Sequence, residues 1–128
     1  MAHQVLTLTS VHEPTGYSHA SRVGNTLYIA GQVAKDRDNN LVGRSDIEAQ
    51  VRQVYANLAS ILEETGGRLE NIVKMTTFLT DLASIGSYRK VRNELFAEPY
   101  PPNTLVIVQS LFSPEYLVEI EAIAVLDG

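Results

Sequence analysis

The sequence predicts an α+β fold in which two helices cover one face of a mixed β-sheet, with the elements in the order βββαβαββ. Two segments carry apolar residues at three- and four-residue spacing, as amphipathic helices do, and glycine or proline residues follow each of them. The other regular segments are short and rich in Val, Ile, Leu and Thr, which is typical of strands. A chain of 128 residues, 45% of them hydrophobic, fits one domain over residues 1–128.

The first half of the chain predicts three strands and a long helix. The strands are expected over residues 5–8, 20–23 and 26–31. Residues 35–43 are polar and predict a surface loop. Ser45 and Glu48 fit an S-x-x-E capping box, in which each side chain binds a free backbone N–H of the first helical turn. The helix that begins there is expected to end at Gly66, because glycine adopts the left-handed conformation at little cost.

The second half of the chain predicts three more strands and a second helix. Residues 71–80 predict a strand, and the apolar spacing from about Leu82 to Ala97 predicts the helix. Three prolines between residues 99 and 102 end that helix and require extended backbone. The last two strands are expected over residues 105–109 and 117–126.

Several of the predicted strands are apolar on both faces. They are residues 27–30 (LYIA), 105–108 (LVIV) and 120–126 after the two glutamates. Two helices can cover only one face of so wide a sheet, so a further surface must cover the second face. In a short chain the simplest cover is another copy of the chain, and we therefore expect self-association.

The composition argues against several classes of partner. A net charge of −5 and a sequence pI of about 5.1 provide no basic surface for a phosphate backbone, so no nucleic-acid partner is expected. The absence of cysteine excludes disulfides, thiolate nucleophiles and Cys-rich zinc sites. The longest apolar runs are four or five residues, too short to span a membrane, and the N-terminus shows no signal-peptide pattern. We expect a cytoplasmic protein without a membrane partner.

Glu121 is the first candidate for a catalytic role. It lies in the stretch VEIEAIAV, residues 118–125, with apolar neighbours on both sides along a strand. An unpaired carboxylate there loses hydration, and its pKa should rise unless a donor or a cation meets it. This predicts a general acid/base or a carboxylate that holds water. The alternative is a structural glutamate that pairs with an interface arginine or points to solvent at an edge. Glu119 shares its face but lies nearer the strand start, so we expect Glu119 in solvent.

Six segments of the chain match a known family in order and spacing. They are Gly16-Tyr17, IAGQV at 29–33, AQVRQVYANLASIL at 49–62, NIVKMTTFLTDL at 71–82, PPNTLVIV at 101–108 and VEIEAIAV at 118–125. Any one of them alone is weak evidence. Together they cover nearly the whole chain, which resembles the Rid (reactive intermediate deaminase, YjgF-like) family.

This resemblance implies a fold similar to bacillus-type chorismate mutase, assembled as a homotrimer with one small-molecule cleft at each subunit boundary. It also implies hydrolysis of reactive enamines and imines, such as 2-aminoacrylate, to a ketoacid and ammonia without a metal or a cofactor. In such a cleft the position of Glu121 would hold water against the imine carbon. Tyr17 would line the cleft, and backbone groups near Gly31 and Leu105 would hold the substrate.

The sequence departs from the family at one position. Deaminating members carry an arginine just after the Pro-rich segment, where its guanidinium grips the substrate carboxylate in a bidentate fork. The matching residue here is Asn103, which is uncharged and shorter and can bind a neutral amide, hydroxyl or ring nitrogen. We therefore expect an altered substrate specificity. Arg89 of the second helix could supply a replacement guanidinium from a neighbouring subunit, or it is a solvated helix charge.

The histidines give one further candidate. His19 follows Tyr17 by two residues, so both side chains could face one side of an extended segment. His19 could act as an acid/base or a hydrogen-bonding group, or it could be a partly buried histidine bonded to backbone. His3, His12 and His19 do not have the spacing of metal ligands, so no metal site is expected.

Two classes of function follow from these observations. The first is a Rid-type hydrolase of a small imine or enamine, and Tyr17, Gly31 and Glu121 favour it. The second is a non-catalytic trimer that binds a small metabolite in the same cleft, and Asn103 favours that class. A ribonuclease or translation inhibitor, as some family members are labelled, finds little support in so acidic a chain.

Overall fold

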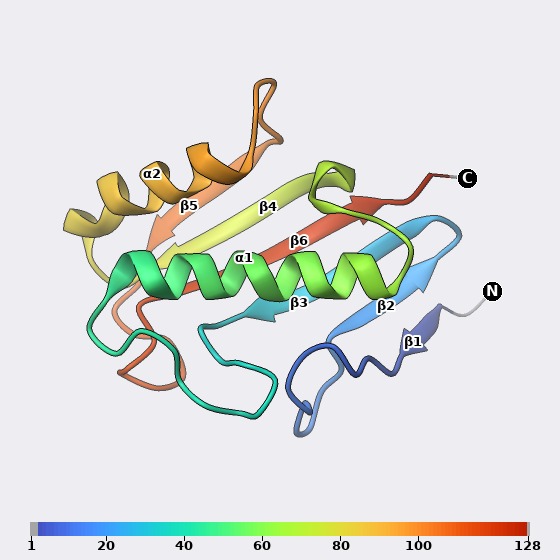
Figure 1. Cartoon of the computed structure of the whole chain (residues 1–128), viewed down its shortest axis with the longest axis horizontal. Coiled ribbons are helices and arrows are strands. Elements are labelled where there is room, and N and C mark those ends of the chain that lie inside the picture. The colour runs from blue at the N-terminus through green and yellow to red at the C-terminus, as the bar shows by residue number, and fades with distance from the viewer. Residues whose placement is uncertain (1–2, 128) are drawn as a thin grey trace.

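The computed structural model describes residues 3–127 and confirms the predicted order of elements (Figure 1). The strands are β1 (Gln4–Leu6), β2 (Ala20–Val23), β3 (Thr26–Gln32), β4 (Ile72–Leu79), β5 (Asn103–Ile107) and β6 (Val118–Val125). The helices are α1 (Ile47–Glu64), between β3 and β4, and α2 (Ile85–Leu95), between β4 and β5. Two short 3₁₀ turns, η1 (Leu69–Asn71) and η2 (Leu82–Ser84), precede β4 and α2.

The sheet is mixed, as predicted, with the strand order β1-β2-β3-β6-β4-β5. Strands β4 and β5 are parallel, and all other neighbours are antiparallel. The C-terminal strand β6 therefore lies in the middle, between β3 and β4 (Figure 1). Its even-numbered residues from Val118 to Ala124 are buried, and its other face carries Glu119 and Glu121 followed by Ile123 and Val125.

Both helices cover the same face of the sheet, which confirms that prediction. Helix α1 packs on β3 and β6 and lies beside α2 (Figure 1). Leu58 and Ile61 of α1 are fully buried, as are Leu27 of β3 and Ile120 of β6. These side chains form the core between the helices and the sheet.

The second face of the sheet has no cover within residues 3–127, and we call it the open face. Its side chains include Tyr28, Val106, Glu121, Ile123 and Val125. Tyr28 keeps 49% of its surface exposed and Val125 keeps 43%. Apolar side chains on a sheet face at this exposure are what the two-sided strands predict for a chain that self-associates.

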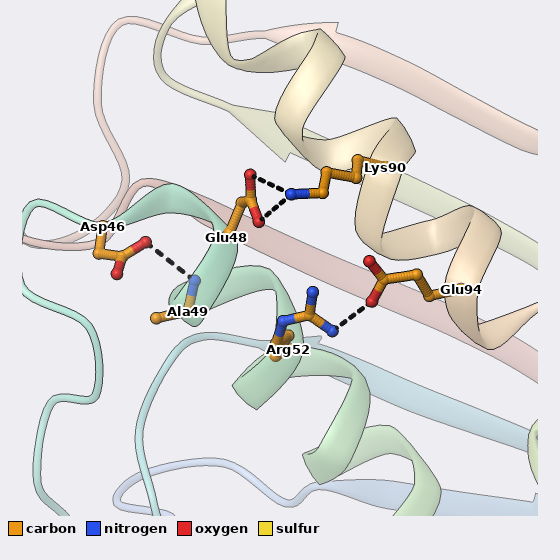
Figure 2. Close-up of polar contacts among 6 residues, drawn as sticks. All are labelled: Asp46, Glu48, Ala49, Arg52, Lys90 and Glu94. Carbon is orange, nitrogen blue, oxygen red and sulfur yellow. Dashed lines mark hydrogen bonds and ion pairs between the residues drawn. The ribbon is translucent and has the colours of Figure 1, made fainter.

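The start of α1 differs from the predicted capping box. Asp46, not Ser45, is the N-cap, and its carboxylate accepts a hydrogen bond from the backbone N–H of Ala49 at 3.1 Å (Figure 2). Ser45 has a positive φ of 59° and so lies outside the helix. Glu48 turns away from the cap and pairs with Lys90 of α2 at 3.1 Å. Asp and Ser are both favoured N-cap residues, and here Asp46, next to the predicted Ser45, is the N-cap.

The second half of the chain also begins its elements at slightly different places. Residues 82–84 form the turn η2, so α2 begins at Ile85 and not near Leu82. Strand β5 begins at Asn103, two residues before the predicted start, because Asn103 pairs with Met75 of β4. A second exposed ion pair, Arg52–Glu94, joins α1 to α2 (Figure 2). Across residues 3–127, neither helix is both long and apolar enough to cross a membrane.

Candidate functional site

Two of the predicted site residues, Tyr17 and Gly31, line one cavity of about 440 Å³ together with Glu119. Tyr17 comes from the loop between β1 and β2, Gly31 from the end of β3, and Glu119 from the start of β6. Lys35 and Phe112 line the same space from two further loops. We call it the Tyr17 cavity. It joins a phenol, a carboxylate, an ammonium group and an aromatic wall.

Glu119 owes its place to the missing side chain of Gly31. A Cβ at position 31 would overlap the Glu119 carboxyl group where it now lies, so an alanine there would require this side chain to move. Burial raises the pKa of Glu119, and the negative charge of Glu121 raises it further. The carboxyl group therefore holds its proton more readily than an exposed glutamate does, as a general acid/base near neutral pH requires.

Tyr17 presents its ring to the cavity, with 48% of its surface exposed. Its hydroxyl lies 3.2 Å from Nε2 of His12, and its ring contacts that of His19 edge to face at 5.5 Å. Burial and the charge of Glu119 both raise the pKa of the phenol. Tyr17 is thus a protonated hydroxyl at neutral pH, able to donate a hydrogen bond inside the cavity.

His19 lies behind the cavity wall and is 1% exposed. Its Nε2 lies 2.8 Å from the backbone oxygen of His12, and its Nδ1 lies 3.1 Å from the side-chain nitrogen of Gln32. This is the alternative in which His19 is a buried histidine bonded to backbone. Both ring nitrogens are occupied, so His19 supports the loop of Tyr17 and leaves no atom for a ligand.

Glu121 lies outside the Tyr17 cavity. It sits opposite Thr76 of β4, with its side chain on the open face, and is exposed. There it lines a different pocket with Tyr28, Lys74 and Thr76. The expectation that Glu119 points to solvent is wrong, since Glu119 is partly buried and Glu121 is the exposed member of the pair. The two glutamates share one strand face, and β3 and the Tyr17 loop enclose only the first of them.

Asn103 is engaged on the helix side of the sheet. Its amide nitrogen donates to the hydroxyl of Tyr88 at 2.6 Å, and its amide oxygen accepts from the hydroxyl of Thr77 at 3.0 Å. The hydroxyl of Thr77 has a single proton and donates it to Asn103. In the 3.3 Å contact between the hydroxyls of Tyr88 and Thr77, Tyr88 is therefore the donor. Tyr55 of α1 donates to Tyr88 at 3.1 Å. We call Asn103, Tyr88 and Thr77 the hydroxyl ring.

The remaining candidates also lie away from the Tyr17 cavity within one chain. Leu105 lies on β5 opposite Thr77, and Arg89 is an exposed residue of α2. Strand β5 is separated from β3 by β6 and β4. Three strand spacings amount to about 14 Å, so one chain does not bring Asn103, Leu105 or Arg89 together with Gly31.

The sequence did not point to His12 or Lys35 as site residues, although both line the Tyr17 cavity. Both missed residues lie in loops, where no periodicity shows which way a side chain points. Gly31, two residues after Ile29 in a strand, carried a usable signal, because glycine inside a strand often marks a close approach of another group. Among residues 3–127, no group of three or more His, Cys, Asp or Glu side chains is arranged to hold a metal ion.

Comparison with known sequences shows relatives over nearly the full chain. The sequence model of the family described as Endoribonuclease L-PSP matches residues 8–126. A RutC family protein of Pyrococcus abyssi is 37% identical over 125 residues, which are 97% of this chain and 98% of that protein. A protein of Dermatophagoides farinae named 2-iminobutanoate/2-iminopropanoate deaminase is 30% identical over 116 residues, 90% of each chain.

Comparison with solved structures gives the same fold. RidA from an Antarctic Psychrobacter matches with a TM-score of 0.89 and 35% identity, over 96% of this chain and 99% of that one. YyfA of Yersinia pestis, described as a Rid family protein of unknown function, matches with a TM-score of 0.91 and 32% identity. That match covers 98% of this chain and 100% of that chain.

Proposed function

The chain belongs to the Rid, or Endoribonuclease L-PSP, family, and we propose that it hydrolyses small imines and enamines in the Tyr17 cavity. One observation carries this proposal: a partly buried carboxyl group, Glu119, stands over Gly31 in the cavity that Tyr17 lines. The relative from Dermatophagoides farinae is named as a deaminase of 2-iminobutanoate and 2-iminopropanoate. The same class of substrate suits the groups in this cavity.

The reaction converts a C=N bond and one water molecule into a C=O bond and ammonia. The oxygen of water bonds to the imine carbon, and the π electrons of C=N move to nitrogen, which takes up a proton. In the collapse of this carbinolamine the hydroxyl proton is transferred to the amine nitrogen, the oxygen lone pair forms C=O, and the C–N bond breaks to release ammonia. Glu119 is suited to accept a proton from the attacking water and to return a proton to nitrogen, because its raised pKa lies nearer to neutral pH. Tyr17 would donate a hydrogen bond to the substrate.

The second half of the cleft would come from another copy of the chain. Asn103, Leu105 and Arg89 lie on β5 and α2, far from Gly31 within one chain. The exposed apolar side chains of the open face suit a contact between copies. We propose a homotrimer in which each Tyr17 cavity faces the β5 edge of a neighbour.

Recognition of a charged substrate would depend on residues other than Asn103. The hydroxyl ring occupies the oxygen of the Asn103 amide and one of its N–H groups. Among the described residues that line the Tyr17 cavity, Lys35 is the one lysine or arginine. We propose that a substrate anion is held by Lys35, in a weaker and less directional way than a bidentate arginine would hold it. The altered specificity would then be a weaker preference for substrates that carry a carboxylate.

A second candidate function is binding of a small metabolite without turnover. The engagement of Asn103 in the hydroxyl ring favours it, since the best anchor for an anionic substrate is absent at that position. In that case Glu119 and Tyr17 would contribute hydrogen bonds to a ligand and no proton transfer.

The experiment generates 2-aminoacrylate with a serine dehydratase and follows ketoacid release with and without the protein. We expect only a modest acceleration by the wild type, since Lys35 holds a carboxylate less firmly than an arginine does. Lys35→Met should lower it several-fold, and Lys90→Met on α2 is the matched control. Lys90 pairs with Glu48 and lies outside the cavity. No acceleration, together with a thermal shift on adding 2-oxobutanoate, would favour the binding protein.

A further inference from the structure

His12 lies in the loop between β1 and β2 and is 4% exposed. Its Nε2 lies 3.2 Å from the hydroxyl oxygen of Tyr17. Its Nδ1 is buried and has no hydrogen-bond partner among residues 3–127. A buried polar atom without a partner is rare and calls for an explanation. The position of the single ring proton on His12 supplies one.

The neighbouring His19 shows how the protons of this cluster are arranged. Its Nε2 faces the backbone oxygen of His12, which can only accept, so Nε2 of His19 carries the proton. Its Nδ1 then accepts from the amide nitrogen of Gln32. That nitrogen also donates to the backbone oxygen of Ala30 at 3.1 Å, which fixes the orientation of the amide. His19 is therefore a neutral ring with its proton on Nε2.

His12 is neutral as well. Its pKa is lowered to about 4, chiefly by burial and to a smaller extent by the neighbouring His19 and Lys35. The carboxyl groups of Glu13 and Glu119 line the same cavity. A neutral imidazole carries one proton. If Nδ1 held it, a buried N–H would lack an acceptor, which costs more than a lone pair without a donor. The proton therefore belongs on Nε2, where Tyr17 can accept it.

From this arrangement we infer that His12 is a positioning residue for Tyr17. Its Nε2–H donates to the Tyr17 oxygen, so the hydroxyl proton of Tyr17 turns away from His12 and towards the cavity. Tyr17 is then a fixed donor to whatever ligand occupies the space beside Glu119 and Gly31. The inference deepens the proposed function and rests on it only for the statement that the ligand reacts.

Nuclear magnetic resonance tests the proton position without any need for turnover. Long-range ¹H–¹⁵N correlation spectra of the full-length protein at pH 7 distinguish the two nitrogens of each histidine. The His12→Gln variant assigns the His12 signals by their disappearance. We expect a neutral His12 with its proton on Nε2. A proton on Nδ1, or a charged His12 at pH 7, would overturn the inference.

Kinetics test whether His12 acts through Tyr17. In His12→Gln the amide nitrogen can reach the position of Nε2 and donate a hydrogen bond to the Tyr17 oxygen. In His12→Asn the side chain is too short for its amide nitrogen to reach that position. We expect kcat/KM to fall about fivefold in His12→Asn and His12→Phe, the size of one neutral hydrogen bond, and to stay near wild type in His12→Gln. On a Tyr17→Phe background, His12→Phe should cause no further loss.

Two kinetic results would overturn the inference. One is an equal loss in His12→Gln and His12→Phe that follows their loss of thermal stability, which would make His12 a packing residue. The other is a full additional loss in the His12→Phe/Tyr17→Phe double variant. If the wild type shows no turnover, the proposed function fails, and the NMR result still decides the position of the His12 proton.

Discussion

The carboxyl group of Glu119 occupies the volume that a Cβ on Gly31 would need. The two residues belong to neighbouring strands, β6 and β3, and the register between those strands shifts between Ile29 and Gln32. A missing side chain on one strand thus creates the place for a functional group on the next. The candidate site depends on this pair more than on any other contact.

Gly31→Ala should therefore displace the Glu119 carboxyl group. Gly31 does not have a positive φ, so the added methyl group causes no backbone strain and acts through the overlap alone. We expect ketoacid release to fall at least tenfold while the far-UV circular dichroism spectrum stays unchanged. Gly86→Ala is the matched control, because a Cβ there meets open space. Equal activity of Gly31→Ala and the wild type would show that Glu119 does not need its present position.

The raised pKa of Glu119 predicts a pH-dependent stability. Because the folded state holds this proton more tightly than the unfolded state, its contribution is fully present below the ordinary pKa of 4.5 and is lost as the pH rises through the higher folded pKa. Glu119→Gln stays neutral and lacks this loss. In urea titrations at one protein concentration, the midpoint of Glu119→Gln relative to wild type should rise from pH 4 to pH 7. A constant difference over this range would contradict the raised pKa.

The hydroxyl ring predicts a structural role for Asn103. Asn103→Ala leaves the hydroxyls of Tyr88 and Thr77 short of partners beneath α2, so it should lower the free energy of unfolding by about 1–3 kcal/mol. Thr104→Ala, at the next residue on the other face of β5, should change it by less than about 0.5 kcal/mol. Denaturant unfolding measures both. Equal stability of the two variants would show that the Asn103 amide is available for a ligand.

Much of the fold could be predicted from the chain alone, because helices and strands follow from local periodicity. The spacing of Val51, Val54 and Leu58 predicts the buried side of α1, and the alternation in β6 predicts two faces. Local periodicity does not predict which of Glu119 and Glu121 lines a cavity with Tyr17. Both lie on the same face, and what distinguishes them is a distant loop and a glycine on β3. His12 left no periodic signal, since its role depends on a contact with Tyr17 across a turn.

The open face predicts an assembly. Tyr28 and Val125 would be buried if copies of the chain associate through this face, and a homotrimer would place β5 of one copy beside the Tyr17 cavity of the next. Native mass spectrometry at micromolar concentration should give three times the 14.1 kDa mass of one chain. Tyr28→Asp, which introduces a charge on the open face, should shift the protein to monomers. A monomeric wild type would remove the shared cleft.

The most direct measurement compares Glu119→Gln with Glu121→Gln in the coupled assay, after light scattering has shown that both variants assemble as the wild type does. The two substitutions are chemically identical and lie two residues apart on one strand face, so they differ in the burial of the carboxyl group and in the pocket they alter. We expect Glu119→Gln to lower kcat/KM at least about a hundredfold, as loss of a general acid/base does, and Glu121→Gln to stay within about threefold of wild type. A large loss in Glu121→Gln with near-normal activity in Glu119→Gln would contradict the assignment of the reaction to the Tyr17 cavity.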